Sequence, residues 1–529
     1  MAASVKRVLR RGFEAAERGC DRVFSPALNP FAQLGALGYF LFWIVAASGI
    51  YLFIFFDTGV VNAYASLEWI SNDLWYHAGI MRSFHRYASD LMVVVMVVHL
   101  LREFSLDRYR GVRWFSWLTA VPIILFLYIS GITGYWLVWD QLAQFVAIVS
   151  TELLDWLPIF SEPIARNFLT PQSLSGRFFT LLVFLHIVIP LLLLLMMWIH
   201  IQHISQPRVN PPRALMAMIL AALLATSLWK PALSQGPADL SRVTSEVGID
   251  WFFLPLYPLV DLLSHGVIWA LLGGFTLLVL VMPWLPPLKR PQAAVVHLDH
   301  CNGCARCVED CPYEAIRLVP RSDGLPFPNA VAVNPDLCVG CGICTGACPS
   351  STPFRRTGDL VTGIDLPDLP LKELRDRTIA AAARLQGPAR ILVLACQHGA
   401  ASGGGGHENA TVFLPCVAMA PPSLIDFILS RDLADGVVIA GCAERTCYNR
   451  LGVEWTKARI AGKRDPYLRE RVPRERLATI WADRSERTRF EAELAAFSKS
   501  VAKLPETEPR MVRAAPSRQP ENCVREPIA

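Results

Sequence analysis

Charged residues are scarce in this chain: Asp, Glu, Lys and Arg make up 18% of its 529 residues, against 53% hydrophobic residues. The net charge of +5 is small for this length, so the composition does not indicate nucleic acid binding. Cysteine is almost missing from the first 300 residues, where only Cys20 occurs. The first thirty residues are rich in arginine and lack the apolar core and cleavage site of a secretory signal.

The remaining cysteines all follow residue 300, and most of them stand in C-x-x-C or related spacings. Such spacings are typical of metal ligands in a reducing compartment rather than of disulfides. Residues 36–286 are dominated by long apolar runs, whereas residues 287–529 have the composition of a soluble protein. The length predicts about three to four domains, and the apolar runs predict that the first of them lies in a membrane.

Six segments are apolar over a length close to the roughly 20 residues that a membrane-spanning helix needs. They are residues 35–56, 85–102, 114–138, 178–203, 214–230 and 264–286, of which the fifth is the shortest. Lys and Arg gather before the first segment, between the second and third, between the fourth and fifth, and after the sixth. By the positive-inside rule, both termini and the cysteine-rich half face the cytoplasm, as expected for an integral protein of the inner membrane.

Two histidine pairs lie in the apolar half with the same spacing, His85 and His99 in the second segment and His186 and His200 in the fourth. Fourteen residues are close to four helical turns, so both members of a pair lie on one helix face, about 21 Å apart. Imidazole is a common axial ligand of haem iron, and ionisable residues inside a membrane usually serve a function. Two such helices side by side could hold two haems. The alternative, a core histidine or a proton relay at each position, does not explain the repeated spacing.

Residues 29–286 resemble cytochrome b of the bc-type quinol complexes, because the two histidine pairs match the ligand pattern of that family. The resemblance implies two b haems. One would be ligated by His85 and His186 near the outer side of the membrane, and the other by His99 and His200 near the cytoplasmic side.

Two arginines and several small residues extend this resemblance. Arg82 and Arg102 stand three residues outside the histidines of the second segment, where the family has arginines that meet haem propionates. The alternative is that they extend to the membrane surface. The same fourteen-residue interval separates Gly35 from Gly49 in the first segment and Ala120 from Gly134 in the third. They would admit a porphyrin edge or allow close helix packing.

Two further stretches resemble the quinone sites of cytochrome b. Residues 134–139 resemble the segment that follows the third helix, and residues 249–257 resemble the stretch at the outer quinol site. The family has a Pro-Glu pair there, and its glutamate is thought to accept a quinol proton. Ile249 and Asp250 stand in their place, so Asp250 is the candidate proton acceptor and quinol bifurcation is in doubt. The alternative is an amphipathic outer segment with a solvated carboxylate.

Two cysteine runs of the form C-x2-C-x2-C-x3-C-P lie between residues 293 and 354. In such runs three thiolates surround one [4Fe–4S] cubane and the fourth ligates the other. The first cubane is therefore predicted to bind Cys301, Cys304, Cys307 and Cys348. The second is predicted to bind Cys338, Cys341, Cys344 and Cys311. The doubled run resembles the bacterial two-cluster ferredoxins; zinc is the alternative.

Four more cysteines follow: Cys396, Cys416 and Cys442 end strand-like runs, and Cys447 comes five residues after the last of these. Parallel strands end at one edge of a sheet, so these thiols are expected to converge on an iron–sulfur cluster. Residues 388–505 resemble the delta subunit of methyl-viologen-reducing hydrogenase, which implies a [2Fe–2S] cluster. Gly399 stands where that family usually has another cysteine. Buried structural thiols are the alternative.

The sequence thus predicts a multi-domain protein, with an α-helical transmembrane bundle of about six helices, a ferredoxin-like α+β domain and a small α/β domain. The predicted parts are a cytoplasmic segment 1–34, a dihaem domain 35–286, a ferredoxin domain 293–354, a linker with a helix at 355–387, an iron–sulfur domain 388–505 and a disordered tail 506–529.

Together these parts predict a membrane electron-transfer subunit of a quinone oxidoreductase. Electrons would pass between a cytoplasmic partner and the quinone pool, and the partner would be a flavoprotein or a subunit like those of heterodisulfide reductases or dehydrogenases. Two alternatives are an electron-relay anchor without a quinone site and a bc-like quinol-oxidising core. Membrane lipid is the surrounding solvent, and the analogy with cytochrome b allows a homodimer.

Overall fold

The structure is a computed structural model, and it describes two compact units, Met1–Pro287 and Leu288–Ala529. The described residues are 2–504, except for twelve short gaps. The gaps are 26–27, 160–162, 165–168, 170–173, 175, 203–208, 243–245, 286–290, 352–359, 388, 404–410 and 445–446. The predicted tail 506–529 lies outside the described residues.

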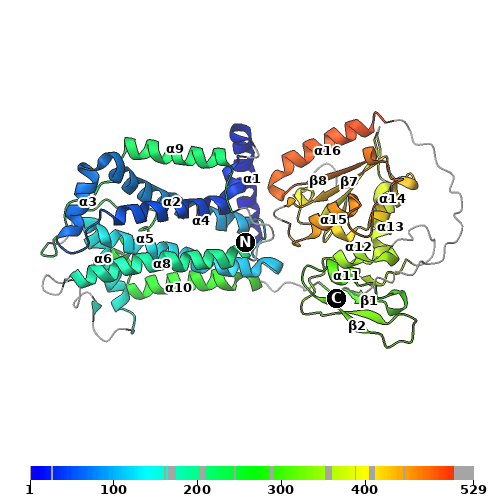
Figure 1. The fold of residues 1–529 in the computed structure, drawn as a ribbon, viewed down its shortest axis with the longest axis horizontal. Helices are drawn as coiled ribbons and strands as arrows, with labels where there is room; N and C mark the ends of the chain where they lie inside the picture. Colours follow the sequence, from blue (N-terminus) through cyan, green and yellow to red (C-terminus); the bar gives the residue numbers. More distant parts are fainter. Residues whose placement is uncertain are drawn as a thin grey trace. The chain divides into compact units, whose positions relative to one another are not determined.

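Long helices make up the first unit and lie side by side (Figure 1). They are α2 (Leu34–Phe53), α4 (Ile80–Ser105), α5 (Trp114–Val138), α8 (Gly176–Gln202), α9 (Arg213–Trp229) and α10 (His265–Val281). The main packing pairs are α2 with α4 and α5 with α8, around a shared apolar core. The unit therefore has the predicted bundle of apolar helices.

Four stretches in the described part of the chain are long and apolar enough to cross a membrane: Pro30–Phe53, Trp114–Val138, Gly176–Gln202 and His265–Trp284. Helix α4 is 26 residues long but carries five charged side chains. Helix α9 has only 17 residues. The two other segments predicted to span thus differ from the four in charge or in length.

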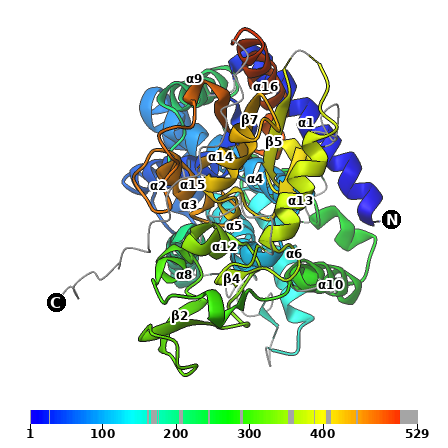
Figure 2. The same cartoon turned by 90° about the vertical axis from the view of Figure 1, so that its right-hand side faces the viewer.

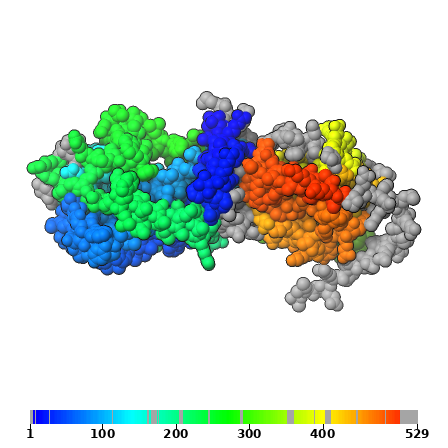
Figure 3. Space-filling view, turned by 90° about the horizontal axis from the view of Figure 1, so that it is seen from above, coloured from blue at the N-terminus to red at the C-terminus, as the bar shows by residue number. Residues whose placement is uncertain are grey.

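Three helices in the first unit escaped prediction: α1 (Ala2–Phe24), α3 (Asn62–Asn72) and α6 (Gln141–Asp155). They are amphipathic and lack the long apolar runs on which the prediction depended. Helix α1 lies at the surface of its unit (Figure 3). It is tied to α4, because Arg102 Nε donates to Glu17 Oε1 over 2.7 Å between two buried side chains.

The second unit begins with the cysteine runs. Strands β2 (Ile316–Pro320) and β3 (Asn329–Val333) form an antiparallel hairpin. Two short helices, α11 (Arg306–Asp310) and α12 (Ile343–Ala347), each begin inside a cysteine run. Strand β1 (Val295–Val296) pairs with β4 (Ile364–Asp365), which brings the chain after the second run back to the start of the unit.

A parallel four-stranded sheet forms the rest of the second unit, in the order β6–β5–β7–β8. Its two central strands, β5 and β7, are labelled in Figure 2. Its strands are β5 (Ile391–Cys396), β6 (Thr411–Leu414), β7 (Gly436–Gly441) and β8 (Leu477–Trp481). The helices between and around them are α13 (Leu371–Ala382), α14 (Pro422–Ser430), α15 (Gly452–Ile460) and α16 (Arg487–Val501). These strands are apolar along nearly their whole length because helices cover both faces of the sheet, and the mixed α/β character agrees with the prediction.

One apolar core joins the cysteine-rich part of the second unit to one face of the parallel sheet, and a second core lies between the other face and α16. The first core joins Val331 of the hairpin and Ile364 of β4 to Leu392 and Ile439 of the parallel sheet. The sequence suggested two separate domains joined by a linker. In the structure, the segment between them contributes strand β4 and helix α13 to the same packed body.

Candidate functional site: haem pockets and cysteine quartets

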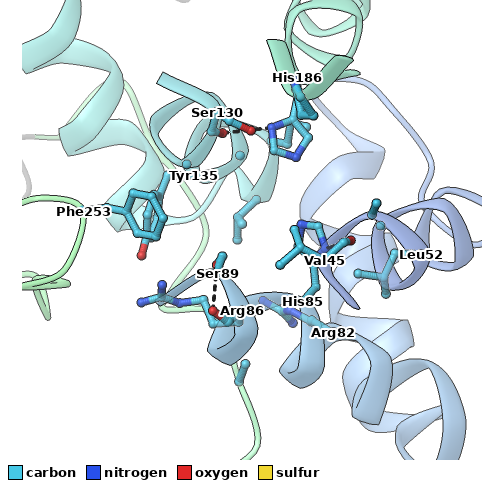
Figure 4. Close-up of a pocket in the computed structure, with 18 of the residues that line it drawn as sticks. Val45, Leu52, Arg82, His85, Arg86, Ser89, Ser130, Tyr135, His186 and Phe253 are labelled. Carbon is cyan, nitrogen blue, oxygen red and sulfur yellow. Dashed lines mark hydrogen bonds between the residues drawn. The ribbon is translucent and has the colours of Figure 1, made fainter. Parts of the chain in front are cut away.

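His85 of α4 and His186 of α8 point toward one another (Figure 4), and their ring centres are 6.2 Å apart. Two coaxial imidazoles on one metal ion, with bonds of about 2 Å each, have their ring centres about 6 Å apart. Nδ1 of His85 is 2.9 Å from Val45 O, and Nδ1 of His186 is 3.0 Å from Ser130 O. With Nδ1 donating to a carbonyl, Nε2 of each ring is free to ligate iron.

A cavity of about 670 Å³ surrounds this pair and is lined mainly by apolar side chains. Gly49 and Gly134 both line it. A Cβ at Gly49 would lie 3.0 Å from Cε1 of His85, and one at Gly134 would lie 2.8 Å from Cε1 of His186. The two predicted glycines therefore leave room for the imidazole rings themselves, as well as for any group held between them.

The second pair lies fourteen residues further along the same two helices. Nδ1 of His200 is 2.9 Å from Oγ1 of Thr119 on α5. A Cβ at Gly35 would be 3.6 Å from Nε2 of His99, so α2 approaches this ring as it approaches His85. Nδ1 of His99 is buried and has no hydrogen-bond partner among the described residues. A buried donor without a partner is costly, which suits a site completed by another group.

Two threonines that the sequence analysis missed repeat the same interval. Thr119 contacts His200, and Thr133 contacts His186 over 3.3 Å, both through Nδ1. Both lie on α5, fourteen residues apart, beside Ala120 and Gly134. The interval that identified the histidines would therefore have identified these partners too.

The two predicted propionate-binding arginines differ in their surroundings. Arg82 is buried and donates to Leu67 O, to the hydroxyl of Ser71 and to Ser234 Oγ. The carboxylates of Glu68 and Asp140 interact with its charge from a distance, and these three hydrogen bonds all go to neutral oxygens. Arg102 is instead paired with Glu17, so a propionate would have to share it.

Asp250 lies at the same cavity, in a network of charged and polar groups. Its Oδ2 accepts from Arg86 Nη1 over 2.8 Å and from the hydroxyl of Tyr135. Arg86 also pairs with Asp90, one helical turn further along α4. The side chain of Asp250 is only 2% exposed, so the carboxylate is neither solvated nor free of a counter-charge. The sequence analysis missed Arg86, Asp90 and the role of Tyr135.

Thiols of the two cysteine runs lie close enough to affect one another's pKa. Burial, and after it the neighbouring Cys304, Cys348 and Cys301, raise the pKa of Cys307. The pKa of Cys344 is likewise raised by burial, then by Cys307 of the first set, and then by Cys338 and Cys311. The pKa of Cys341 is raised by burial, then by Cys344 and Cys416, with Cys311 contributing. These neighbours suit the prediction that each quartet takes three thiols from one run and the fourth from the other, and they also show Cys307 close to Cys344.

Cys396, Cys416, Cys442 and Cys447 also come together, at the carboxyl edge of the parallel sheet. The sulfur atoms of Cys396 and Cys442 are 3.6 Å apart. Hydrogen bonds from Cys396 and Cys447 lower the pKa of Cys442. A Cβ at Gly452 would lie 2.3 Å from Sγ of Cys416 and 3.7 Å from Sγ of Cys447, so both thiols face this glycine. All four side chains are buried.

The donor sets suit clusters of several irons. Twelve thiols in three quartets are available, and thiolates are the ligands that hold iron–sulfur clusters. Within the described residues, no three His, Cys, Asp or Glu side chains are grouped as ligands of a single metal ion. Gly399, where the delta subunits usually have a cysteine, contributes no thiol and lies against the backbone of Gly441.

Three regions of the chain match three family models. Residues 20–207 match the model described as cytochrome b/b6/petB, and residues 300–352 match the 4Fe-4S dicluster domain. Residues 407–505 match the delta subunit of methyl-viologen-reducing hydrogenase. The prediction that the chain combines these three kinds of protein is confirmed. The matched regions include all four histidines but neither Asp250 nor Cys396.

Among curated proteins, the chain is similar to cytochrome b6 of Porphyra purpurea. The two are 28% identical over 191 residues, which is 35% of this chain and 87% of that protein. Among solved structures, it is similar to a chain described as hyperthermophilic respiratory Complex III. The identity is 20% and the TM-score 0.41, over 49% of this chain and 77% of the other. The family matches and the apolar helices make this chain a membrane electron-transfer protein with a cytochrome b region and a [4Fe–4S] region.

Proposed function

We propose that the chain carries electrons between a cytoplasmic flavin or iron–sulfur partner and the quinone pool, as the membrane subunit of a quinone oxidoreductase. It would hold one [2Fe–2S] cluster, two [4Fe–4S] clusters and two b haems. The observation that carries the proposal is the grouping of ligands: His85 and His186 face one another at 6.2 Å, and the thiols of Cys396, Cys416, Cys442 and Cys447 lie together. His99 and His200 repeat the spacing of the first pair on the same two helices, and the doubled cysteine runs supply the remaining thiols. The clusters and haems supply one-electron redox couples when bound.

The residues of the chain hold and orient the groups. Val45 O, Ser130 O and Thr119 Oγ1 each fix the ring orientation of one histidine through Nδ1, which leaves Nε2 for the metal. Arg82 supplies a buried positive charge at the cavity of His85 and His186. In the second unit, the four thiols at the carboxyl edge of the sheet are buried away from water, and this edge brings together thiols that are far apart in the sequence.

The cavity of His85 and His186 also supports a quinone site. Asp250 and Tyr135 both line it, and their side chains offer a carboxylate and a phenol to a quinone carbonyl or hydroxyl. Asp250 is the proposed proton acceptor. A relay anchor without a quinone site is the second candidate, because one cavity of about 670 Å³ could be filled by the haem alone.

The residues at the proposed quinone site argue against a bc-like quinol-bifurcating core. Ile249 and Asp250 stand where cytochrome b has a Pro-Glu pair, and the shorter carboxylate of Asp250 is held by Arg86 and Tyr135. Asp250 also lies outside the matched cytochrome b region. We therefore propose proton exchange with quinone at this site without bifurcation.

The direction follows from potentials. Ferredoxin clusters of the plant type lie near about −400 mV, and quinones accept electrons at higher potential, so transfer from the cytoplasm to quinone is downhill. A membrane potential that is negative inside favours moving an electron outward by about 2.3 kcal/mol per 100 mV. The partner would be a flavoprotein or a subunit like those of heterodisulfide reductases or dehydrogenases, docked at residues 388–505. Cytoplasmic termini, the domain bounds given above and a homodimer belong to the same proposal.

A spectroscopic titration tests the quinone part of the proposal. The purified protein is reduced until the haem bands appear, and a short-chain quinone analogue is added with and without a quinone-site inhibitor. We expect the analogue to reoxidise the haems and the inhibitor to slow this at least about tenfold, which corresponds to about 1.4 kcal/mol. If the analogue changes neither the haem spectrum nor the rate of haem reoxidation, the quinone site is refuted and the relay anchor is the better description.

A further inference from the structure

Arg459 of α15 is the largest side chain that is fully buried in the described part of the chain, with 1% of its surface exposed. Its guanidinium pairs with Asp310, whose side chain is 3% exposed. Nη1 donates to Ala418 O over 2.8 Å, and Nη2 is 3.5 Å from Ile343 O. A buried charge is costly unless it is paired and hydrogen-bonded, so this arrangement needs a reason.

Each contact of Arg459 lies on a segment that carries proposed cluster ligands. Asp310 directly precedes Cys311, and Ile343 stands between Cys341 and Cys344. Ala418 follows Cys416 by two residues. One side chain thus joins both runs that form the second cubane quartet to the loop of the C-terminal quartet.

A glycine allows this close approach. Gly346 lies in α12, between Cys344 and Cys348, and a Cβ there would be 2.0 Å from Ala418 O and 2.9 Å from Nη1 of Arg459. The backbone of the second cysteine run therefore packs directly on the segment after Cys416. Cys341 packs beside Cys416 in the same apolar cluster, with Ile343 and Trp455.

Further hydrogen bonds tie the same two parts together. The hydroxyl of Tyr313 donates to Oδ1 of Asn449 over 3.1 Å, and Nε1 of Trp455 donates to Asp310 O over 3.2 Å. Arg450 donates to Pro312 O over 3.1 Å. None of the described contacts gives the first cubane quartet a comparable approach to the C-terminal thiols. The second quartet is the one that adjoins them, while Cys304 of the first is exposed.

We propose that Arg459 is a positioning residue that fixes the C-terminal quartet against the quartet of Cys311, Cys338, Cys341 and Cys344, and that its charge sets the potentials of both. This rests on the proposed function, because it assumes that both quartets hold clusters. The step that Arg459 serves moves one electron and no atom: the donor is oxidised by one electron as the acceptor is reduced by one.

The charges nearby allow the role to be tested. Asp310 pairs with Arg464 as well as with Arg459, and the Arg464 side chain is 24% exposed. Replacing Arg459 by glutamine leaves Asp310 paired and removes one buried positive charge. A reduced cluster carries one more negative charge, so its reduction becomes less favourable. Lysine keeps the buried positive charge beside Asp310 without the planar set of donors, so it separates the effect of the charge on the potentials from that of the hydrogen bonds.

The experiment is an EPR-monitored redox titration of the full-length protein with its clusters, together with iron and sulfide content. In Arg459→Gln we expect the reduction potentials of two clusters to become more negative, those of the C-terminal cluster and of the cubane held by Cys311, Cys338, Cys341 and Cys344. The expected shift is about tenfold in the reduction equilibrium, or about 59 mV. The other cubane should shift by less than half of that. Arg459→Lys should restore both potentials, and the matched control Arg464→Gln should move them less, because its charge is partly solvated.

Two results would overturn the proposal. One is an equal shift, or no shift, of all three signals in Arg459→Gln with cluster content retained. The other is an Arg464→Gln shift as large as that of Arg459→Gln. If Arg459→Gln loses its clusters, the lysine variant decides: restored clusters with wild-type potentials support the proposal, and unrestored potentials contradict it. A wild-type protein without a C-terminal cluster signal is a separate result, which contradicts the proposed function itself.

Discussion

Gly452 offers the most selective way to remove the C-terminal cluster without touching a ligand. It is the first residue of α15, and a Cβ at this position would lie 2.3 Å from Sγ of Cys416. The same atom would be 3.7 Å from Sγ of Cys447 and 3.8 Å from Cδ1 of Ile343. Gly452→Ala therefore forces the Cys416 sulfur to move, while the other thiols keep their places.

The size of the effect follows from two opposing terms. Overpacking a closely packed interior costs about 1–3 kcal/mol, and replacing glycine by alanine in a helix gains up to about 1 kcal/mol. The net loss of stability is about 0–3 kcal/mol, which a domain of this size withstands. The sheet and the cubane quartets should thus remain folded while the displaced thiol no longer reaches the cluster.

The assay is iron and sulfide content with EPR of the reduced protein. We expect Gly452→Ala to lose about two irons per chain and the signal of the C-terminal cluster, with both cubane signals retained. Lys457→Ala is the matched control, because Lys457 lies on the same helix, is exposed and forms only a surface ion pair with Glu444. A Gly452→Ala protein with a full C-terminal signal would show that Cys416 is not a ligand, and would refute this reasoning.

Three further changes test the membrane unit. His186→Leu should halve the haem content, as measured by the pyridine haemochrome, because His85 loses its partner at 6.2 Å; His265→Leu, at the start of α10, should leave it unchanged. Asp250→Asn should keep both haems, because Arg86 remains paired with Asp90. It should slow the reoxidation of the haems by a quinone analogue at least about tenfold. An unchanged reoxidation rate would show that Asp250 is not part of the quinone site. Glu17→Gln leaves the buried Arg102 without its closest carboxylate and should lower the free energy of unfolding by about 1–3 kcal/mol. The loss should appear as a lower thermal midpoint of unfolding in detergent. An unchanged midpoint would mean that the docking of α1 does not depend on this pair.

The sequence predicted the features that repeat. Fourteen-residue intervals identify His85, His99, His186 and His200, and the doubled cysteine runs identify both quartets, because ligand geometry imposes regular spacing on one helix or one loop. The parallel sheet was predictable because its strands are apolar along their length and are separated by helical patterns. The convergence of Cys396, Cys416 and Cys442 then follows from the topology alone.

Contacts between distant segments were not predictable. Arg86 with Asp250, Arg102 with Glu17 and Arg459 with Asp310 each join residues more than 80 positions apart. No local pattern encodes such pairs, because the sequence around an arginine does not indicate which distant carboxylate it will contact in the fold. The shared core of the second unit was not predicted for the same reason. Strands β1 and β4 have only two residues each, which is too short for a sequence pattern, and they pair only in the folded protein.

The central claim is that two histidine pairs and three cysteine quartets hold metal in one chain. The most direct measurement is the metal and haem content of the purified protein, set beside its low-spin haem spectrum and the EPR of its reduced clusters. We predict about twelve irons per chain, two of them in haem, with two cubane signals and one further cluster signal. A protein with no low-spin haem bands, or with far less iron than two cubanes require, would contradict the account.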